Sequence, residues 1–144
     1  MSMSVESIVI ATDLNKTFKA EQKGLDDVQA LQGINMQIKT GQLTALVGPD
    51  GAGKTTFLRL IAGLYKPTAG SLEVLGMDVA KDPQSVQDRI SYMPQKFGLY
   101  EDLSIQENLD LYADLHGVPM NVRKERFARL LKITDLARFT ERPA

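Results

Sequence analysis

Several apolar segments in the first two thirds of the chain have the patterns typical of β-strands. Ile34, Met36 and Ile38 alternate with polar residues, as expected for a strand with one buried face. The other apolar runs are short and rich in Ile, Val or Leu, which favours buried strands. The pattern predicts strands at residues 7–11, 34–38, 43–47, 71–75 and 90–93.

Helical spacing begins after a glycine-rich segment and dominates the last third of the chain. Phe57, Leu58 and Ile61 recur at helical spacing, and Ser104 with Glu107 has the spacing of a capping box at a helix start. Glycine and proline residues mark the helix ends. Helices are therefore predicted around residues 57–61 and at 83–89, 104–115 and 121–132.

The last of these helices is expected to be amphipathic. Three residues form an apolar stripe that should lie in the helix core: Phe127, Leu130 and Leu131. Three arginines recur every third residue and should share one exposed face: Arg123, Arg126 and Arg129. The order of elements indicates an α/β fold, which we divide into a core at residues 1–96 and a helical portion at 97–144.

Composition narrows the possible partners. The 144 residues include 17 Lys and Arg against 18 Asp and Glu, a net charge of −1. Such a chain has no general attraction to nucleic acid, and we expect no nucleic-acid partner. The absence of cysteine excludes disulfides and thiolate metal sites. Because no apolar run approaches the roughly 20 residues needed to span a bilayer, we expect no direct membrane insertion.

The segment VGPDGAGKTT, residues 47–56, carries the most specific motif. Gly48, Gly53, Lys54 and Thr55 occupy the fixed positions of G-x-x-x-x-G-K-[ST]. The glycines allow backbone N–H groups to surround phosphate oxygens, Lys54 reaches the β- and γ-phosphates, and Thr55 offers a hydroxyl to Mg²⁺. A glycine-rich turn with a solvated lysine is the alternative, which the predicted flanking strand and helix disfavour. The segment predicts a nucleoside triphosphate site.

Asp50 is an acid within this predicted phosphate cradle. A carboxylate about 4 Å from a phosphate charge would cost roughly 4 kcal/mol at an effective dielectric constant of 20. Because the cradle is made of backbone amides, Gly51 and Gly53 allow these amides to turn inward while the Asp50 side chain turns outward. We therefore expect Asp50 to face solvent or a partner surface.

The chain resembles the ATP-binding subunits of ABC transporters. Their loop reads G-P-N-G-A-G-K-[ST]-T, and GPDGAGKTT departs from it only at Asp50. The resemblance implies a P-loop NTPase core of the ABC ATPase type, with a partial sheet whose N-terminal portion is antiparallel, and the start of a helical subdomain. It also implies that ATP contacts the whole loop: Gly48, Pro49, Asp50, Gly51, Ala52, Gly53, Lys54, Thr55 and Thr56.

Two further residues take roles from this resemblance. Phe18, in LNKTF, resembles the aromatic residue that stacks on adenine, although the interval after it is longer than is common. Gln95, in SYMPQKFGLYEDLS, resembles the glutamine that approaches Mg²⁺ and the attacking water, so the resemblance assigns Mg²⁺ to Thr55 and Gln95. The alternatives are a core or loop aromatic for Phe18 and a strand-end residue for Gln95.

The resemblance also implies a function and partners. Within the family, the chain is most similar to the first half of tandem multidrug-efflux ATPases. We expect the complete protein to couple ATP binding and hydrolysis to export through separate membrane-spanning subunits, at the cytoplasmic side of the inner membrane. A second nucleotide-binding domain is the other expected partner.

Turnover is not expected from these 144 residues alone. The family's signature loop, catalytic glutamate and switch histidine do not occur in the sequence. The chain is therefore expected to bind ATP without hydrolysing it. Two alternatives stay open: a non-catalytic nucleotide-binding module, and a P-loop small-molecule kinase whose lid would use the three arginines at 123, 126 and 129.

Overall fold

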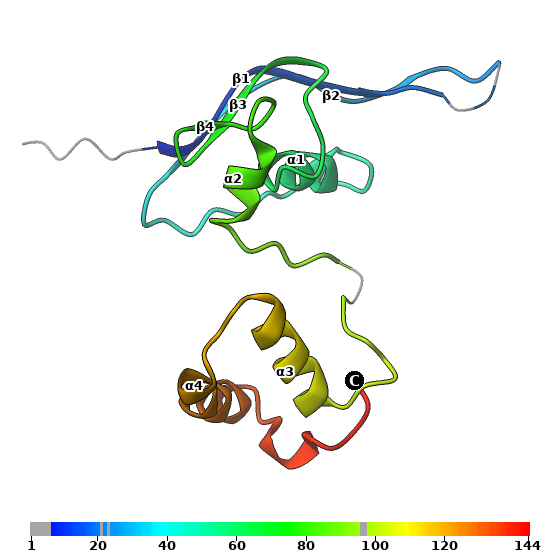
Figure 1. Cartoon of the computed structure of the whole chain (residues 1–144). Coiled ribbons are helices and arrows are strands. Elements are labelled where there is room, and N and C mark those ends of the chain that lie inside the picture. Colours follow the sequence, from blue (N-terminus) through cyan, green and yellow to red (C-terminus); the bar gives the residue numbers. More distant parts are fainter. Residues whose placement is uncertain (1–6, 21, 23, 96–97) are drawn as a thin grey trace, which may run out of the picture. The chain divides into compact units, whose positions relative to one another are not determined.

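The computed structural model describes residues 7–20, 22, 24–95 and 98–144. The chain divides into two compact units, Met1–Tyr92 and Met93–Ala144 (Figure 1). The glycine-rich loop belongs to the first unit. The division expected after residue 96 remains a prediction.

The first unit is built on an antiparallel sheet. Its four strands are β1 (Ser7–Phe18), β2 (Val28–Lys39), β3 (Ala69–Val74) and β4 (Met77–Asp78), in the spatial order β2-β1-β3-β4. Every neighbouring pair is antiparallel, which confirms the expected antiparallel N-terminal portion. The predicted strands at 7–11, 34–38 and 71–75 lie within or overlap β1, β2 and β3.

β1 continues beyond its apolar start because side-chain amides satisfy the backbone where the strand bends. The pairing with β2 shifts register between Ala11 and Leu14, and Asp13 has a φ of 45°. The Asp13 N–H donates to Asn35 Oδ1 at 2.9 Å, and the Gly33 N–H of β2 donates to Asn15 Oδ1 at 3.0 Å. These bonds satisfy backbone donors at the irregularity, so β1 stays paired as far as Phe18.

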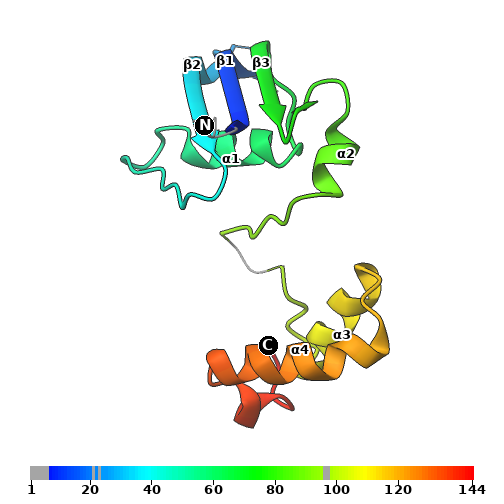
Figure 2. The same cartoon turned by 90° about the vertical axis from the view of Figure 1, so that its left-hand side faces the viewer.

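One face of the sheet is covered by helices α1 (Lys54–Ile61) and α2 (Pro83–Gln87). Figure 1 shows both helices on the same side of the sheet, and Figure 2 shows α1 crossing the strands. Phe57 and Leu60 of α1 are only 3% and 0% exposed. They pack in a core that also contains Leu14, Leu31, Leu72, Val79 and Val86. The predicted helix after the glycine-rich segment is confirmed, and the core fixes its position against the sheet.

Residues 43–47 and 90–93 are irregular, so the two strand predictions there are wrong. Leu43 and Val47 are almost fully exposed, although Leu46 packs against the core. A strand needs a neighbour for its backbone N–H and C=O groups. No strand of the described residues pairs with either segment. Apolar composition alone therefore misled the prediction.

The second unit consists of α3 (Ile105–Leu115), α4 (Met120–Ile133) and a short 3-10 helix, η1 (Ala137–Phe139). The predicted capping box is confirmed: the Glu107 N–H donates to Ser104 Oγ at 3.2 Å, and the Ser104 N–H donates to Glu107 Oε2 at 2.8 Å. Within the described ranges, no helix combines the length and hydropathy of a membrane span.

Arg123 is buried, so the expectation of one exposed arginine face on α4 is wrong. Its Nη2 lies 2.6 Å from Asp114 Oδ1, and its Nε donates to the Val118 carbonyl at 2.8 Å. The ion pair and the hydrogen bond join α4 to the end of α3. The prediction for Leu130 is wrong in the opposite sense: its side chain was expected to be buried, but the residue is 52% exposed.

Residues 142–144 lie against the start of α3. The Ile105 N–H donates to the Arg142 carbonyl, and the Ala144 N–H donates to the Leu103 carbonyl, both at 3.0 Å. Ser104 and Pro143 form an isolated antiparallel bridge between these bonds. The last residues of the chain are thereby held against the start of α3.

Candidate nucleotide-binding site

The glycine-rich loop of the first unit lies close to β2. Gly51 and Gly53 have φ values of 80° and 84°, in the left-handed region that favours glycine. A Cβ on Gly53 would lie 2.5 Å from the Ala30 carbonyl oxygen and 2.7 Å from Leu31 Cδ2. Both the backbone conformation and the contact with β2 therefore require glycine at position 53.

Lys54 folds back over the loop that precedes it. Its Nζ donates to the carbonyl oxygens of Gly48 and Pro49, each at 2.7 Å. A lysine ammonium has three N–H donors. Two donors are thus used by the loop and the third can meet an anion at the same place.

The N-terminus of α1 has no side-chain cap. Gly53 is the N-cap residue and the first turn contains no acidic residue. The first N–H groups of a helix lack partners within the helix, and the helix dipole favours negative charge at this end. Together with the Lys54 ammonium, these N–H groups form a candidate phosphate-binding arrangement.

Thr55 and Asp50 are both exposed beside this arrangement. Thr55 lies in the first turn of α1, where its hydroxyl can reach a cation bound to phosphate oxygens. The described residues contain no group of three or more His, Cys, Asp or Glu side chains that could hold a metal ion. The role of Thr55 toward Mg²⁺ remains a prediction.

The glycine-rich loop lines one side of an apolar pocket that the sequence did not indicate. The pocket has a volume of about 160 Å³, and its apolar walls come mainly from Leu31, Ile34, Met36, Leu46 and Phe57. Lys54, Gly53 and Ala52 close it on the loop side. The candidate phosphate-binding loop therefore borders an apolar space on the side that faces β2 and α1.

β2 brings Phe18 and the loop to the same end of the sheet. Val28 of β2 pairs with Phe18, and Ala30, two residues further along, lies against Gly53. Phe18 is half-buried at the end of β1. Two segments that are about 30 residues or more apart in sequence therefore both lie against the first residues of β2. The role of Phe18 toward adenine remains a prediction.

Gln95 does not belong to this unit. It is exposed, lies in an irregular segment and is part of the second unit. Its role toward Mg²⁺ and water remains a prediction.

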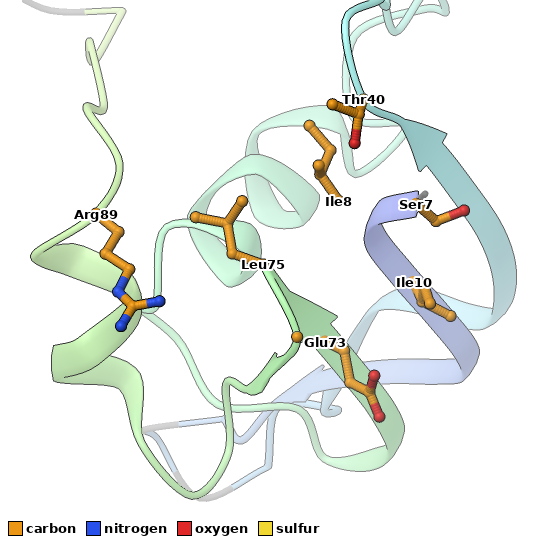
Figure 3. Close-up of a pocket in the computed structure, with 8 residues that line it drawn as sticks. Ser7, Ile8, Ile10, Thr40, Glu73, Leu75 and Arg89 are labelled. Carbon is orange, nitrogen blue, oxygen red and sulfur yellow. The ribbon is translucent and has the colours of Figure 1, made fainter. Parts of the chain in front are cut away.

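A larger open pocket lies elsewhere in the first unit (Figure 3). Its volume is about 680 Å³, and it is lined by the start of β1, the residue after β2, the end of β3 and Arg89. Figure 3 shows Glu73 and Arg89 on separate elements. No residue of the glycine-rich loop lines this pocket, so it is distinct from the phosphate-binding arrangement.

Comparison with known proteins identifies the family. The profile of the family described as "ABC transporter" matches residues 31–144. The chain belongs to the ABC transporter family. This ABC transporter chain is 47% identical over 139 residues to the probable multidrug ABC transporter ATP-binding protein YbhF of Escherichia coli (strain K12). It is 36% identical over 121 residues to the daunorubicin resistance ATP-binding protein DrrA3 of Streptomyces coeruleorubidus. The expected similarity to multidrug-efflux ATPases is confirmed.

Solved ABC ATPases share the fold. A dimeric post-hydrolysis state of the ATP-binding cassette MJ0796, bound to ADP and Pi, matches with a TM-score of 0.79 and 27% identity. The match covers 94% of this chain and 61% of that one. The ABC transporter chain spans 23% of YbhF and 38% of DrrA3. The chain therefore spans only part of the length of these relatives.

Proposed function

We propose that this chain binds ATP through residues 48–56 and forms part of the ATP-binding domain of an ABC-type exporter. The supporting observation is the Lys54 ammonium, held by the Gly48 and Pro49 carbonyls beside the uncapped start of α1. In this proposal Phe18 stacks on adenine, and Thr55 and Gln95 contact Mg²⁺. The multidrug function in the name of YbhF supports export as the process that ATP drives.

Calorimetric titration of the purified chain with MgATP tests the binding site. Lys54→Ala removes a charge-assisted phosphate contact that contributes about 1.5 to 3 kcal/mol. Phe18→Ala removes a base stack of about 1 to 3 kcal/mol, which neighbouring side chains can partly replace, so the Lys54 variant should lose more affinity. Lys81→Ala is the matched control, because Lys81 is exposed and pairs with Asp78. Equal losses in the Lys54 and Lys81 variants would refute the proposed site.

Binding without turnover is the second part of the proposal. Phosphoryl transfer requires a held metal ion, an oriented water and charge stabilisation at the transferred group. The described residues offer the loop, and no acidic cluster accompanies it. Phosphate release by the chain should therefore be no faster than in Lys54→Ala. Release that scales with chain concentration and disappears in Lys54→Ala would contradict this, and would assign catalysis to a residue within the 144.

We further propose that the complete protein hydrolyses ATP with a second nucleotide-binding domain and acts on membrane-spanning subunits at the inner membrane. An apolar groove of about 330 Å³ on the second unit supports a protein partner there; it is lined mainly by Leu99, Ile105, Leu109, Tyr112 and Leu136. Leu99→Asp in the full-length protein should reduce co-purification with the membrane subunits. Leu115→Asp, on an exposed residue outside the groove, is the control. Unchanged co-purification in Leu99→Asp would exclude the groove as the contact.

The small-molecule kinase alternative loses its main support in the structure. Arg123 would have been a lid arginine, but its side chain is 10% exposed and is engaged by Asp114 and the Val118 carbonyl. It cannot reach a phosphate without breaking both contacts.

A further inference from the structure

Four side chains of the first unit, including the candidate base-stacking residue Phe18, form a compact group. This aromatic cluster consists of Lys16 and Phe18 from β1, Arg59 from α1, and Tyr65 from the segment after α1. The rings of Phe18 and Tyr65 lie 5.3 Å apart between centroids and meet at 75°. Lys16 Nζ lies 5.0 Å from the centroid of the Phe18 ring and 5.4 Å from that of the Tyr65 ring. A cation thus lies against two rings that meet almost at right angles.

Lys16 is held in this place by the backbone. Its Nζ donates to the Lys66 carbonyl at 2.9 Å. Two further hydrogen bonds connect the neighbouring backbone segments. The Thr17 N–H donates to Thr68 Oγ1, and the Thr68 N–H donates to the Asn15 carbonyl, both at 2.9 Å. The end of β1 and the segment after α1 are therefore bound together, with the Lys16 ammonium between them.

Tyr65 is held from the side of α1. Arg59 Nη1 donates to Tyr65 Oη at 3.1 Å, and the Tyr65 N–H donates to the Arg59 carbonyl at 3.3 Å. The hydroxyls of Tyr92 and Tyr65 raise the pKa of Arg59, which is consistent with these contacts. The Tyr65 ring also packs against the hydrophobic core. The same helix that begins at the phosphate-binding loop thus fixes Tyr65.

We propose that Lys16 and Tyr65 are positioning residues for nucleotide binding, which hold the Phe18 ring so that one face remains open to a purine. Lys16 occupies one face of the ring, since its ammonium lies over it, and a base must then stack on the other face. Tyr65 restrains the tilt of the ring through the near-perpendicular contact. This inference rests on the proposed function, in which Phe18 stacks on adenine. Preorganisation of the ring lowers the entropy lost when the base binds.

Comparing the binding of two ligands distinguishes a positioning role of Lys16 and Tyr65 from a general role in stability. MgATP carries a base, whereas inorganic tripolyphosphate with Mg²⁺ carries the phosphates alone. The measured quantity is the ratio of the two dissociation constants for the full chain, obtained by calorimetry. The ratio cancels any loss of folded protein, because such a loss weakens both ligands alike. The effect of losing a positive charge is measured separately with a charge-matched variant.

Tyr65→Leu and Lys16→Met should each raise the ratio of the ATP to the tripolyphosphate dissociation constant about threefold to tenfold, as expected for loss of an aromatic or a cation–π contact. Tyr65→Phe keeps the ring and should leave the ratio within about twofold. Lys81→Met is the charge-matched control, since Lys81 pairs with Asp78 and lies outside the aromatic cluster. It should leave the ratio unchanged.

The role of Phe18 is tested by combining variants. If Tyr65 acts through Phe18, then Tyr65→Leu should have no further effect on the ratio in a Phe18→Ala background. The positioning role would be overturned if Tyr65→Leu raised the ratio of dissociation constants equally in the Phe18→Ala background. It would also be overturned if the single variants lost the same affinity for ATP and for tripolyphosphate. Failure of the unaltered chain to bind either ligand would instead overturn the proposed function, and this inference with it. Binding of tripolyphosphate without any preference for ATP would refute the base-stacking role while leaving the phosphate site intact.

Discussion

Substitution of Gly53 tests the contact between the candidate phosphate-binding loop and β2. Alanine at this position must adopt a φ of 84°, and its Cβ would lie 2.5 Å from the Ala30 carbonyl oxygen. The left-handed conformation costs roughly 1 to 2 kcal/mol for a non-glycine residue. The steric overlap adds about 1 to 3 kcal/mol, as in overpacked cores. The expected loss of stability for Gly53→Ala is therefore roughly 2 to 5 kcal/mol.

Gly51→Ala is the matched control for this prediction. Gly51 has nearly the same φ, 80°, but a Cβ there would meet no atom within 4 Å. It should lose only the conformational part, roughly 1 to 2 kcal/mol. The effect of glycine on the unfolded chain is the same for both variants, so the difference between them isolates the contact with Ala30.

Amide hydrogen exchange of β2 is the appropriate assay, because it reports the stability of the first unit separately from that of the second. Faster exchange in Gly53→Ala than in Gly51→Ala, by the equivalent of about 1 to 3 kcal/mol, is expected. Equal exchange in the two variants would show that the loop does not press against β2, and the geometric argument for the site would fail.

Three further predictions concern Asp50 and the second unit. Asp50→Asn should change the dissociation constant for ATP by less than about fivefold in calorimetry, since Asp50 is exposed; a large loss would show that the acid is a ligand. Asp114→Ala should lower the melting temperature of the second unit more than Arg123→Met does, because it leaves a buried guanidinium without its carboxylate; the reverse order would refute this. Hydrogen bonds from the Ser104 N–H and, to a smaller extent, from its hydroxyl lower the pKa of Glu107 in the folded chain. The capping box therefore stabilises α3 fully at pH values above the ordinary glutamate pKa of about 4.3. This stabilisation is lost as the pH falls through the lower pKa of the folded chain. Helicity measured by circular dichroism should therefore decline on acidification more in the unaltered chain than in Glu107→Gln, and identical acid transitions would contradict it.

Local signals predicted the parts of the structure that depend on neighbouring residues. The motif at residues 48–55 required a turn followed by a helix, and α1 begins at Lys54. The capping box of Ser104 and Glu107 involves residues three apart, and both of its hydrogen bonds are present. In each case the residues that define the signal also make the contacts.

Non-local contacts could not be derived from the same patterns. Residues 43–47 have the composition of a strand, but composition does not supply a pairing partner. The spacing of Arg123 suggested an exposed face, yet Asp114 on the preceding helix draws its side chain inward. The contact between Phe18 and Tyr65 joins residues 47 positions apart, and no periodic pattern in the sequence predicts it. The resemblance to a family suggested the role proposed for Phe18, whereas its contacts with Lys16 and Tyr65 are visible only in the structure.

The contact between residues 142–144 and the start of α3 has a consequence for the order in which the second unit folds. The Ala144–Leu103 hydrogen bond joins residues 41 positions apart, whereas the capping box of Ser104 and Glu107 joins residues three apart. Closing a long loop costs conformational entropy before its contacts are gained. The first turn of α3 should therefore form before residues 142–144 dock against it.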